Sequence, residues 1–116
     1  MKIEILFPCC CNLFGDLSNM DYLRKCLPDA EFVETAITDE PVFARERVDM
    51  VYLGPMTERT QELVLERLRP YRERIWELIT GGTLFLFTGN ALELAGEYIV
   101  KEDDSRLQCL GIFPIY

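Results

Sequence analysis

Histidine is absent from the 116 residues of this chain, and that absence removes the usual general base at physiological pH and the commonest metal ligand. Basic residues are also scarce, with 12 Lys and Arg against 20 Asp and Glu, so the formal net charge is −8. A field of this sign repels phosphate backbones and anionic membrane surfaces. We therefore expect no nucleic-acid partner, no membrane partner and no histidine-based catalysis.

Long apolar runs are missing as well. None reaches the length of a bilayer span, and the apolar residues 1–7 are fewer than a signal peptide's hydrophobic region needs. The five cysteines have no other secretory cue beside them and are interpreted as reduced thiols. These features predict a cytoplasmic protein.

The composition and length predict one globular domain over residues 1–116. Hydrophobic residues make up 49% and charged residues 28%, within the range of ordinary folded proteins. Apolar and β-branched runs that predict strands alternate with helical patterns. Strands are expected at 2–7, 31–37, 48–53, 83–87, 98–100 and 110–115, and helices at 16–26, 57–80 with a break at Pro70, and 91–96.

This alternation predicts an α/β fold in three layers, a mostly parallel sheet with helices on both faces, as in flavodoxin-like domains. The run at 83–87 is expected to be a fourth buried strand, and Leu63 is expected on the buried face of the long helical region. Charges alternate in sign from Glu58 to Arg74, a pattern typical of a solvent-facing, ion-paired helix surface.

Ligands of such sheets bind beyond the carboxyl ends of the strands. Residues 8–19, 54–57 and 88–91 follow three of the predicted strands and are expected to meet there. Asn12, Gly15, Asp16, Asn19, Gly54, Gly89 and Asn90 are the candidate ligand-binding residues within these segments.

The same segments carry motifs of a known family. The run Asn12-Leu13-Phe14-Gly15-Asp16 followed by Asn19 resembles the Asn-Leu-Tyr-Gly-Asp-x-x-Asn signature of class I glutamine amidotransferases of the cobyric acid synthase and lipid II isoglutaminyl synthase type. Residues 49–54, 82–96 and 109–113 are similar, in the same order, to that family's glycine-rich loop strand, nucleophile turn and Gly-Leu-Gly strand. The resemblance implies a glutamine amidotransferase-like domain.

The family's catalytic residues are missing at the matching positions. Gly89 stands where the resemblance places the nucleophilic Cys, and glycine has no atom that could attack an amide. Pro55 lies in the loop that would supply oxyanion-hole N–H groups and has no N–H to donate. The family's late His and Glu are also missing, because the resemblance covers only the front portion of the family's domain.

Alternatives stay open for individual residues. Gly89 fits a tight turn that needs positive φ, or the N–H groups of residues 89–91 bind an anion. Asp16 and Asn19 cap a helix or contact a ligand. Cys9, Cys10 and Cys11 are interpreted as small buried or loop-end hydrophobes rather than a metal or redox site, because adjacent strand residues point to opposite faces.

These observations predict a catalytically inactive glutamine amidotransferase-like domain that binds a ligand or partner and uses no cofactor or metal. One alternative is a truncated form or subunit of a working amidotransferase that acts with a ligase or synthetase partner. Another is a structural homo-oligomer that covers an exposed sheet edge or apolar face.

Overall fold

The computed structural model describes residues 1–8, 11, 17–96, 98–100 and 106–112, and the statements below concern these residues. The α-helices are α1 (Leu17–Cys26), α2 (Glu58–Leu68) and α3 (Arg72–Thr80). Short 3₁₀ helices are η1 (Val42–Ala44), η2 (Arg69–Tyr71) and η3 (Gly89–Ala95). The strands are β1 (Lys2–Leu6), β2 (Glu31–Thr35), β3 (Met50–Leu53), β4 (Leu84–Phe87), β5 (Tyr98–Val100) and β6 (Arg106–Gln108).

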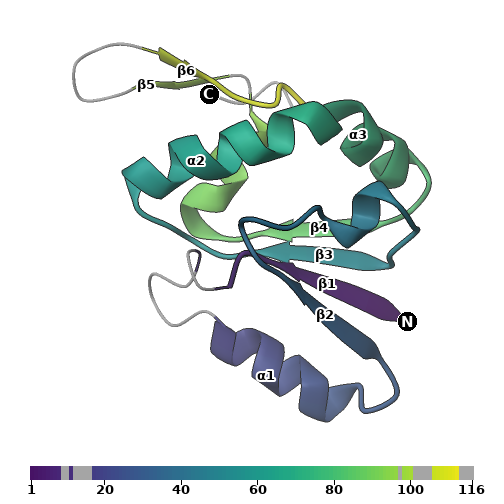
Figure 1. The fold of residues 1–116 in the computed structure, drawn as a ribbon. Helices are drawn as coiled ribbons and strands as arrows, with labels where there is room; N and C mark the ends of the chain where they lie inside the picture. Colours follow the sequence, from purple (N-terminus) through teal and green to yellow (C-terminus); the bar gives the residue numbers. More distant parts are fainter. Residues whose placement is uncertain (9–10, 12–16, 97, 101–105, 113–116) are drawn as a thin grey trace.

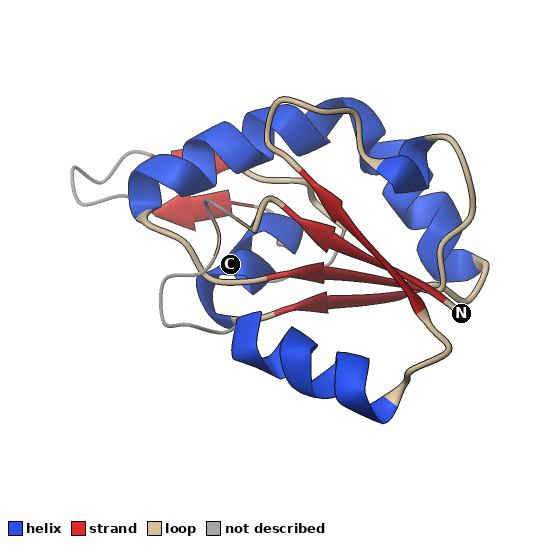
Figure 2. Cartoon of the chain, turned by 60° about the horizontal axis from the view of Figure 1, so that its bottom comes forward, coloured by secondary structure: helices blue, strands red, loops and turns tan. Residues whose placement is uncertain are grey.

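The main sheet has four parallel strands in the order β2-β1-β3-β4. Helix α1 covers one face of this sheet, while α2 and α3 cover the other (Figures 1 and 2). The three-layer α/β fold expected from the alternation of strands and helices is therefore confirmed. Parallel neighbours need crossover connections, and here α1 joins β1 to β2 while α2, η2 and α3 join β3 to β4.

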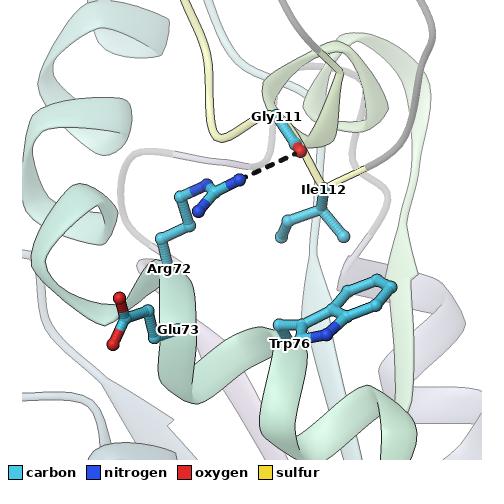
Figure 3. Close-up of a pocket in the computed structure, with 5 residues that line it drawn as sticks. All are labelled: Arg72, Glu73, Trp76, Gly111 and Ile112. Carbon is cyan, nitrogen blue, oxygen red and sulfur yellow. Dashed lines mark hydrogen bonds between the residues drawn. The ribbon is translucent and has the colours of Figure 1, made fainter.

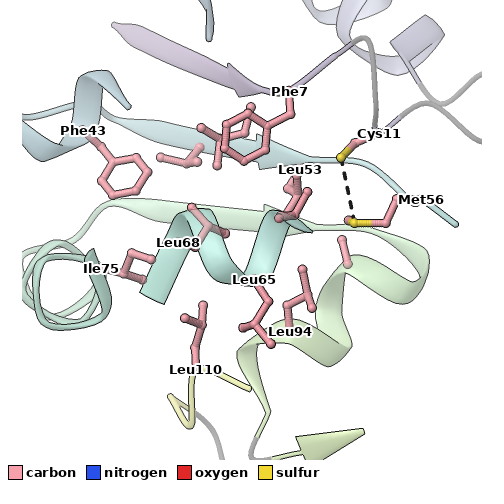
Figure 4. Packing of buried hydrophobic residues seen from close by; sticks show 14 of the residues in the cluster. Phe7, Cys11, Phe43, Leu53, Met56, Leu65, Leu68, Ile75, Leu94 and Leu110 are labelled. Atoms are coloured by element: carbon pink, nitrogen blue, oxygen red, sulfur yellow. Dashed lines mark hydrogen bonds between the residues drawn. The ribbon is translucent and has the colours of Figure 1, made fainter. Parts of the chain in front are cut away.

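The strand register places buried apolar side chains on both faces of the sheet, in two cores. Ile5, paired with Tyr52, packs with Met20 of α1 on one face of the sheet. Leu53, paired with Phe87, lies on the opposite face in the larger core against α2 and α3 (Figure 4). Strand β3 lies inside the sheet and is buried on both faces, which explains its uninterrupted apolar sequence.

Strand β4 corrects the expectation of a fourth buried strand. It lies at the edge of the sheet, and Leu84 is 60% and Leu86 38% exposed. Both leucines share the face of Ile3 and Ile5, which α1 covers over β1 and β2 but not over β4 (Figure 1). The composition of a strand cannot reveal whether it will be central or at an edge.

The helical region between β3 and β4 follows the predicted pattern, with one exception. The side chain of Thr57 caps α2 by accepting a hydrogen bond of 3.2 Å from the Thr60 N–H, and Pro70 falls in η2 between α2 and α3. The exception is Leu63, which is 41% exposed, while Val64 and Leu68 point into the core. The buried face of α2 is thus rotated from the predicted one.

The arginines of this helical region tie distant segments to it. Arg69 donates to the main-chain carbonyl of Gln108 at 2.5 Å, and Arg72 donates to that of Leu110. Arg74 donates to the carbonyl of Phe43. Arg74 also forms an ion pair with Glu77, which lies just beyond the run expected to be ion-paired. The contacts to carbonyls, however, connect η2 and α3 to η1, to β6 and to the segment after β6.

The small second sheet is antiparallel, with β5 paired to β6. We expected the second strand of this hairpin at 110–115, but β6 spans residues 106–108, so the prediction was placed too late in the chain. Leu110 instead packs into the main core, and its N–H donates to the carbonyl of Leu94. The apolar run that looked like a strand is therefore, at its start, a core segment lying along η3.

A fully buried carboxylate fixes the connection between β2 and β3. Glu4 of β1 is 0% exposed, and its oxygens accept hydrogen bonds from the N–H groups of Val42 and Phe43 at 2.8 and 2.9 Å. The Thr35 hydroxyl donates to the same carboxylate at 2.5 Å. Because every buried polar group here has a partner, Glu4 joins β1, β2 and η1 in one network.

Candidate functional site

The carboxyl ends of β1 and β3 form the point in this sheet where a ligand site is expected. The connection that leaves β1 passes to the face covered by α1, and the one that leaves β3 passes to the face covered by α2 (Figures 1 and 2). In doubly wound sheets of order 2-1-3-4 the ligand crevice opens where successive connections diverge in this way. The fold therefore places the candidate site between the loops after β1 and β3.

Gly54 lets these two loops touch. A Cβ on Gly54 would lie 2.5 Å from the carbonyl oxygen of Cys11, a main-chain atom, so no larger residue fits without moving the loop after β1. The side chain of Cys11 is buried, and its sulfur lies 3.9 Å from the sulfur of Met56, in the loop after β3 (Figure 4). The burial expected for Cys11 is therefore confirmed. Cys9 and Cys10 lie outside the described residues.

Phe7, at the end of β1, has a strained backbone. Its φ is +50°, in the left-handed region that bulky residues rarely adopt, and its side chain is 1% exposed. The N–H of Phe7 donates to the Thr35 carbonyl, and its own carbonyl accepts from the Cys11 N–H at 3.0 Å. Such strain costs about 1–3 kcal/mol and is common where a chain must turn sharply beside a site.

Gly89 begins the turn after β4 with a φ of +57°. A Cβ built on Gly89 would lie 2.9 Å from the Cβ of Pro55, so the ring of Pro55 fills the space next to this turn. The interpretation of Gly89 as a turn residue that needs positive φ is confirmed. A side chain at this position would meet both the backbone strain and the Pro55 ring.

The Asn90 side chain joins the loop after β4 to the loop after β3. Its Oδ1 accepts from the Met56 N–H at 2.9 Å, and its Nδ2 donates to the Met56 carbonyl at 2.5 Å. Gln61 of α2 strengthens the junction, because its Nε2 donates to the Asn90 carbonyl at 2.9 Å and to Glu93 at 3.1 Å. The two loops are therefore held together by side-chain amides at their centre.

Two main-chain N–H donors of this junction, those of Met56 and Ala91, are already in use. Pro55 has no N–H, the Met56 N–H donates to Asn90, and the Ala91 N–H donates to the carbonyl of Thr88 at 3.1 Å. An oxyanion hole needs such N–H groups aimed at an open position. These two N–H groups instead serve to hold the loops together.

The structure brings together three of the seven predicted site residues, Gly54, Gly89 and Asn90, through Pro55 and Met56. Asn19 lies in α1, and its side chain is outside what the structure describes. Asn12, Gly15 and Asp16 also lie outside the described residues. Their contribution to a site stays a prediction.

The buried polar side chains of Gln61 and Glu4 were not predicted from the sequence. Gln61 is 3% exposed in a helix whose buried positions are otherwise apolar, and its partners come from η3. A polar residue in the apolar stripe of α2 is a signal that could have indicated a buried hydrogen bond. Glu4, within the apolar strand Lys2–Leu6, gives the same signal.

Cys109 is the other buried thiol in the described part of the chain. It is 5% exposed, and burial raises the pKa of this thiol above its usual value, which suppresses the thiolate. A thiol of this kind is a poor nucleophile and a poor metal ligand at neutral pH.

The described residues have neither a metal-binding cluster nor a membrane-spanning helix. Within the described ranges, no three Cys, Asp or Glu side chains are grouped so that they could hold an ion. No helix there has the length and apolar character needed to cross a bilayer. In comparisons with known proteins, neither a protein-family model nor a curated protein matches the chain.

Proposed function

We propose that this chain is a catalytically inactive glutamine amidotransferase-like domain that binds a small ligand or a partner protein at the carboxyl edge of its sheet. The proposal combines the motif resemblance with the parallel sheet and the meeting of the loops after β1, β3 and β4. Gly89 carries the inactive part of the proposal. It stands where the resemblance places the nucleophile, and Pro55 fills the adjoining space.

Attack on a glutamine amide needs a thiolate on the turn, a base to activate it and N–H donors for the oxyanion. Gly89 supplies no thiolate, the chain contains no histidine, and the N–H groups of Met56 and Ala91 are bonded within the junction. Each deficiency removes a separate part of the reaction. Restoring one of them would not restore the others.

The binding part of the proposal is supported by how rigidly the edge is built. Asn90 and Gln61 make four hydrogen bonds across the junction of β3, β4 and α2, and Gly54 allows the loop after β1 to lie directly on the end of β3. Such a fixed edge loses little conformational entropy when a ligand binds. A ligase or synthetase subunit is the partner that the resemblance implies.

Ammonia release from glutamine by the purified protein tests the proposal. We expect no release above a heat-denatured control. The variant Gly89→Cys should also be inactive, because its side chain would meet Pro55, and the double variant Pro55→Gly with Gly89→Cys should still lack a base. Ammonia released by the unmodified protein above the control would overturn the inactive assignment.

A second candidate function, a structural homo-oligomer, is favoured by the edge strand β4. The four residues of β4, Leu-Phe-Leu-Phe, contain no charge or proline, the devices that commonly protect an exposed edge. Leu84 and Leu86 are also exposed on the face beside α1. A second copy whose β4 pairs antiparallel with the first would bring Leu84 opposite Leu86 of the partner and cover both.

Light scattering after size-exclusion chromatography tests this second candidate. The protein should be a dimer at micromolar concentration, and Leu84→Lys with Leu86→Lys should make it monomeric without unfolding it, because both side chains are exposed in the single chain. The matched control is Leu63→Lys, since Leu63 is similarly exposed on α2. A monomer at every concentration tested would exclude the homo-oligomer.

A further inference from the structure

A pocket on helix α3, away from the carboxyl edge of the sheet, combines an exposed tryptophan with an anchored arginine. It has a volume of about 280 Å³ and is lined by Arg72, Glu73 and Trp76 from α3 and by Gly111 and Ile112 from the segment after β6. Figure 3 shows the indole of Trp76 and the side chain of Ile112 on two sides of the pocket, with the Arg72 guanidinium on a third.

Trp76 is the single tryptophan of the chain and is 50% exposed. A side chain this large usually buries most of its area, and tryptophan is enriched where proteins bind ligands and partners. Ile112 lies across the pocket and is half-buried. Together the two side chains offer an apolar surface that a flat aromatic or branched aliphatic group could cover.

The Arg72 guanidinium is held in place beside this apolar surface. Its Nε donates to the Leu110 carbonyl, and its Nη2 lies 3.4 Å from the Gly111 carbonyl. Arginine has five N–H donors, so these two contacts leave the Nη1 group to donate to a ligand. A guanidinium that is already anchored loses little side-chain entropy on binding, and its planar fork matches a carboxylate.

We infer that this pocket binds a small apolar molecule that bears a single carboxylate. The carboxylate would accept hydrogen bonds from Arg72, and the apolar body would stack on Trp76 and contact Ile112. The volume falls just under the usual range for drug-sized ligands, which favours a compact molecule. Glu73 lies at the rim, on the side of the pocket away from the indole (Figure 3). The negative charge of Glu73 would weaken the binding of an anion and strengthen the binding of a cation.

The single tryptophan makes the test direct, because the only indole of the chain lines this pocket. Phenylacetate is the probe, with phenethylamine as the matched cation and phenylacetamide as the matched neutral molecule. We expect a saturable change of Trp76 fluorescence with phenylacetate, with a dissociation constant on the order of 1 mM, and binding at least about tenfold weaker for the other two. Equal or tighter binding of phenethylamine, or no saturable response to phenylacetate, would overturn the inference.

Two variants separate the roles of the charged residues. Arg72→Gln should weaken phenylacetate at least about tenfold, while Glu73→Gln should tighten it by about two- to fivefold because a nearby like charge is removed. Weaker binding by Glu73→Gln would overturn the single-carboxylate assignment, since a cationic or zwitterionic ligand would behave in that way.

Arg72 also contacts the segment after β6, so its replacement can disturb the fold. The probe series on the unmodified protein is independent of that effect. Amide and indole chemical shifts of the unmodified protein complete the test. Shifts induced by phenylacetate should centre on Trp76 and Ile112, whereas shifts centred on Gly89 and Asn90 would place the ligand at the sheet edge and contradict the inference.

Discussion

The buried carboxylate of Glu4 should be a highly sensitive position in the fold. Three donors point at it, the N–H groups of Val42 and Phe43 and the hydroxyl of Thr35, and none of the carboxylate is exposed to water. Removing an acceptor leaves buried donors unsatisfied, at about 1–3 kcal/mol each. These contributions are not additive, because the freed groups can relax together.

Two substitutions at Glu4 should therefore differ in a definite order. In Glu4→Gln one oxygen still accepts, and Thr35 can turn its hydroxyl to accept from the new amide, so one main-chain N–H loses its partner. We expect a loss of about 2 kcal/mol in the free energy of unfolding. Glu4→Ala removes every acceptor and leaves a cavity, and should cost about 3–5 kcal/mol.

Urea denaturation followed by circular dichroism measures these losses. The midpoint should fall with little change in the slope, because the folded surface stays similar. Glu31→Gln is the matched control. Glu31 lies on the neighbouring strand β2, its side chain is 67% exposed, and its ion pair with Lys2 spans 3.9 Å, so this change should stay within about 0.5 kcal/mol. If Glu4→Gln were as stable as the control, the proposed role of the carboxylate would be refuted.

Four further experiments test the site and its surroundings. Gly54→Ala should destabilise the protein by about 1–3 kcal/mol in the same urea assay, because its Cβ would lie 2.5 Å from a main-chain oxygen of the loop after β1; full stability would show that this loop does not lie on β3. Asn90→Asp should lower the free energy of unfolding by about 1–3 kcal/mol, more than Asn90→Ala does, because a carboxylate would face the Met56 carbonyl. Faster hydrogen exchange of the Met56 amide is the measurement that checks this loss. Cys109 should be alkylated far more slowly than the exposed Cys26, as mass spectrometry of the two peptides would reveal, and comparable rates would contradict its burial. Because burial raises the pKa of Cys109 in the folded state, the unfolded thiol deprotonates first as pH rises. The free energy of unfolding should therefore fall as pH rises above about 8.5, and Cys109→Ala should lack this part of the pH dependence.

The sequence predicted the layers of this fold because they depend on local periodicity. The apolar run ending in Leu53 indicated a strand buried on both faces, Thr57 indicated a helix start, and Pro70 indicated a break, and each is confirmed. Glycines at strand ends were equally informative. Gly54 stands where two loops approach closely, and Gly89 stands where the chain adopts a positive φ; few other residues permit either.

Features that depend on distant partners were not predicted from the sequence. The exposure of Leu84 follows from the position of β4 at the sheet edge, which is a property of the whole sheet. The burial of Glu4 depends on N–H groups of η1, 38 and 39 residues away along the chain. The strand placed at 110–115 was misjudged because a core segment and a strand share the same apolar composition.

At the candidate site too, local patterns were predictable from the sequence and contacts between distant segments were not. Parallel strands predicted that the segments around Gly54, Gly89 and Asn90 would meet, since the carboxyl ends of such strands lie at one edge. That Asn90 would use its amide on Met56, and that Pro55 would lie against Gly89, depends on the relative positions of two loops. No pattern within either loop specifies this.

The most direct test of the inactive assignment is the reaction of the folded protein with an electrophilic glutamine analogue, followed by intact mass. Exposed thiols such as Cys26 can react with any electrophile, so the decisive reading is protection by excess glutamine. We predict that excess glutamine does not lower the amount of any adduct formed on the native chain. A stoichiometric adduct that glutamine prevents would show an active nucleophile and contradict the inactive assignment.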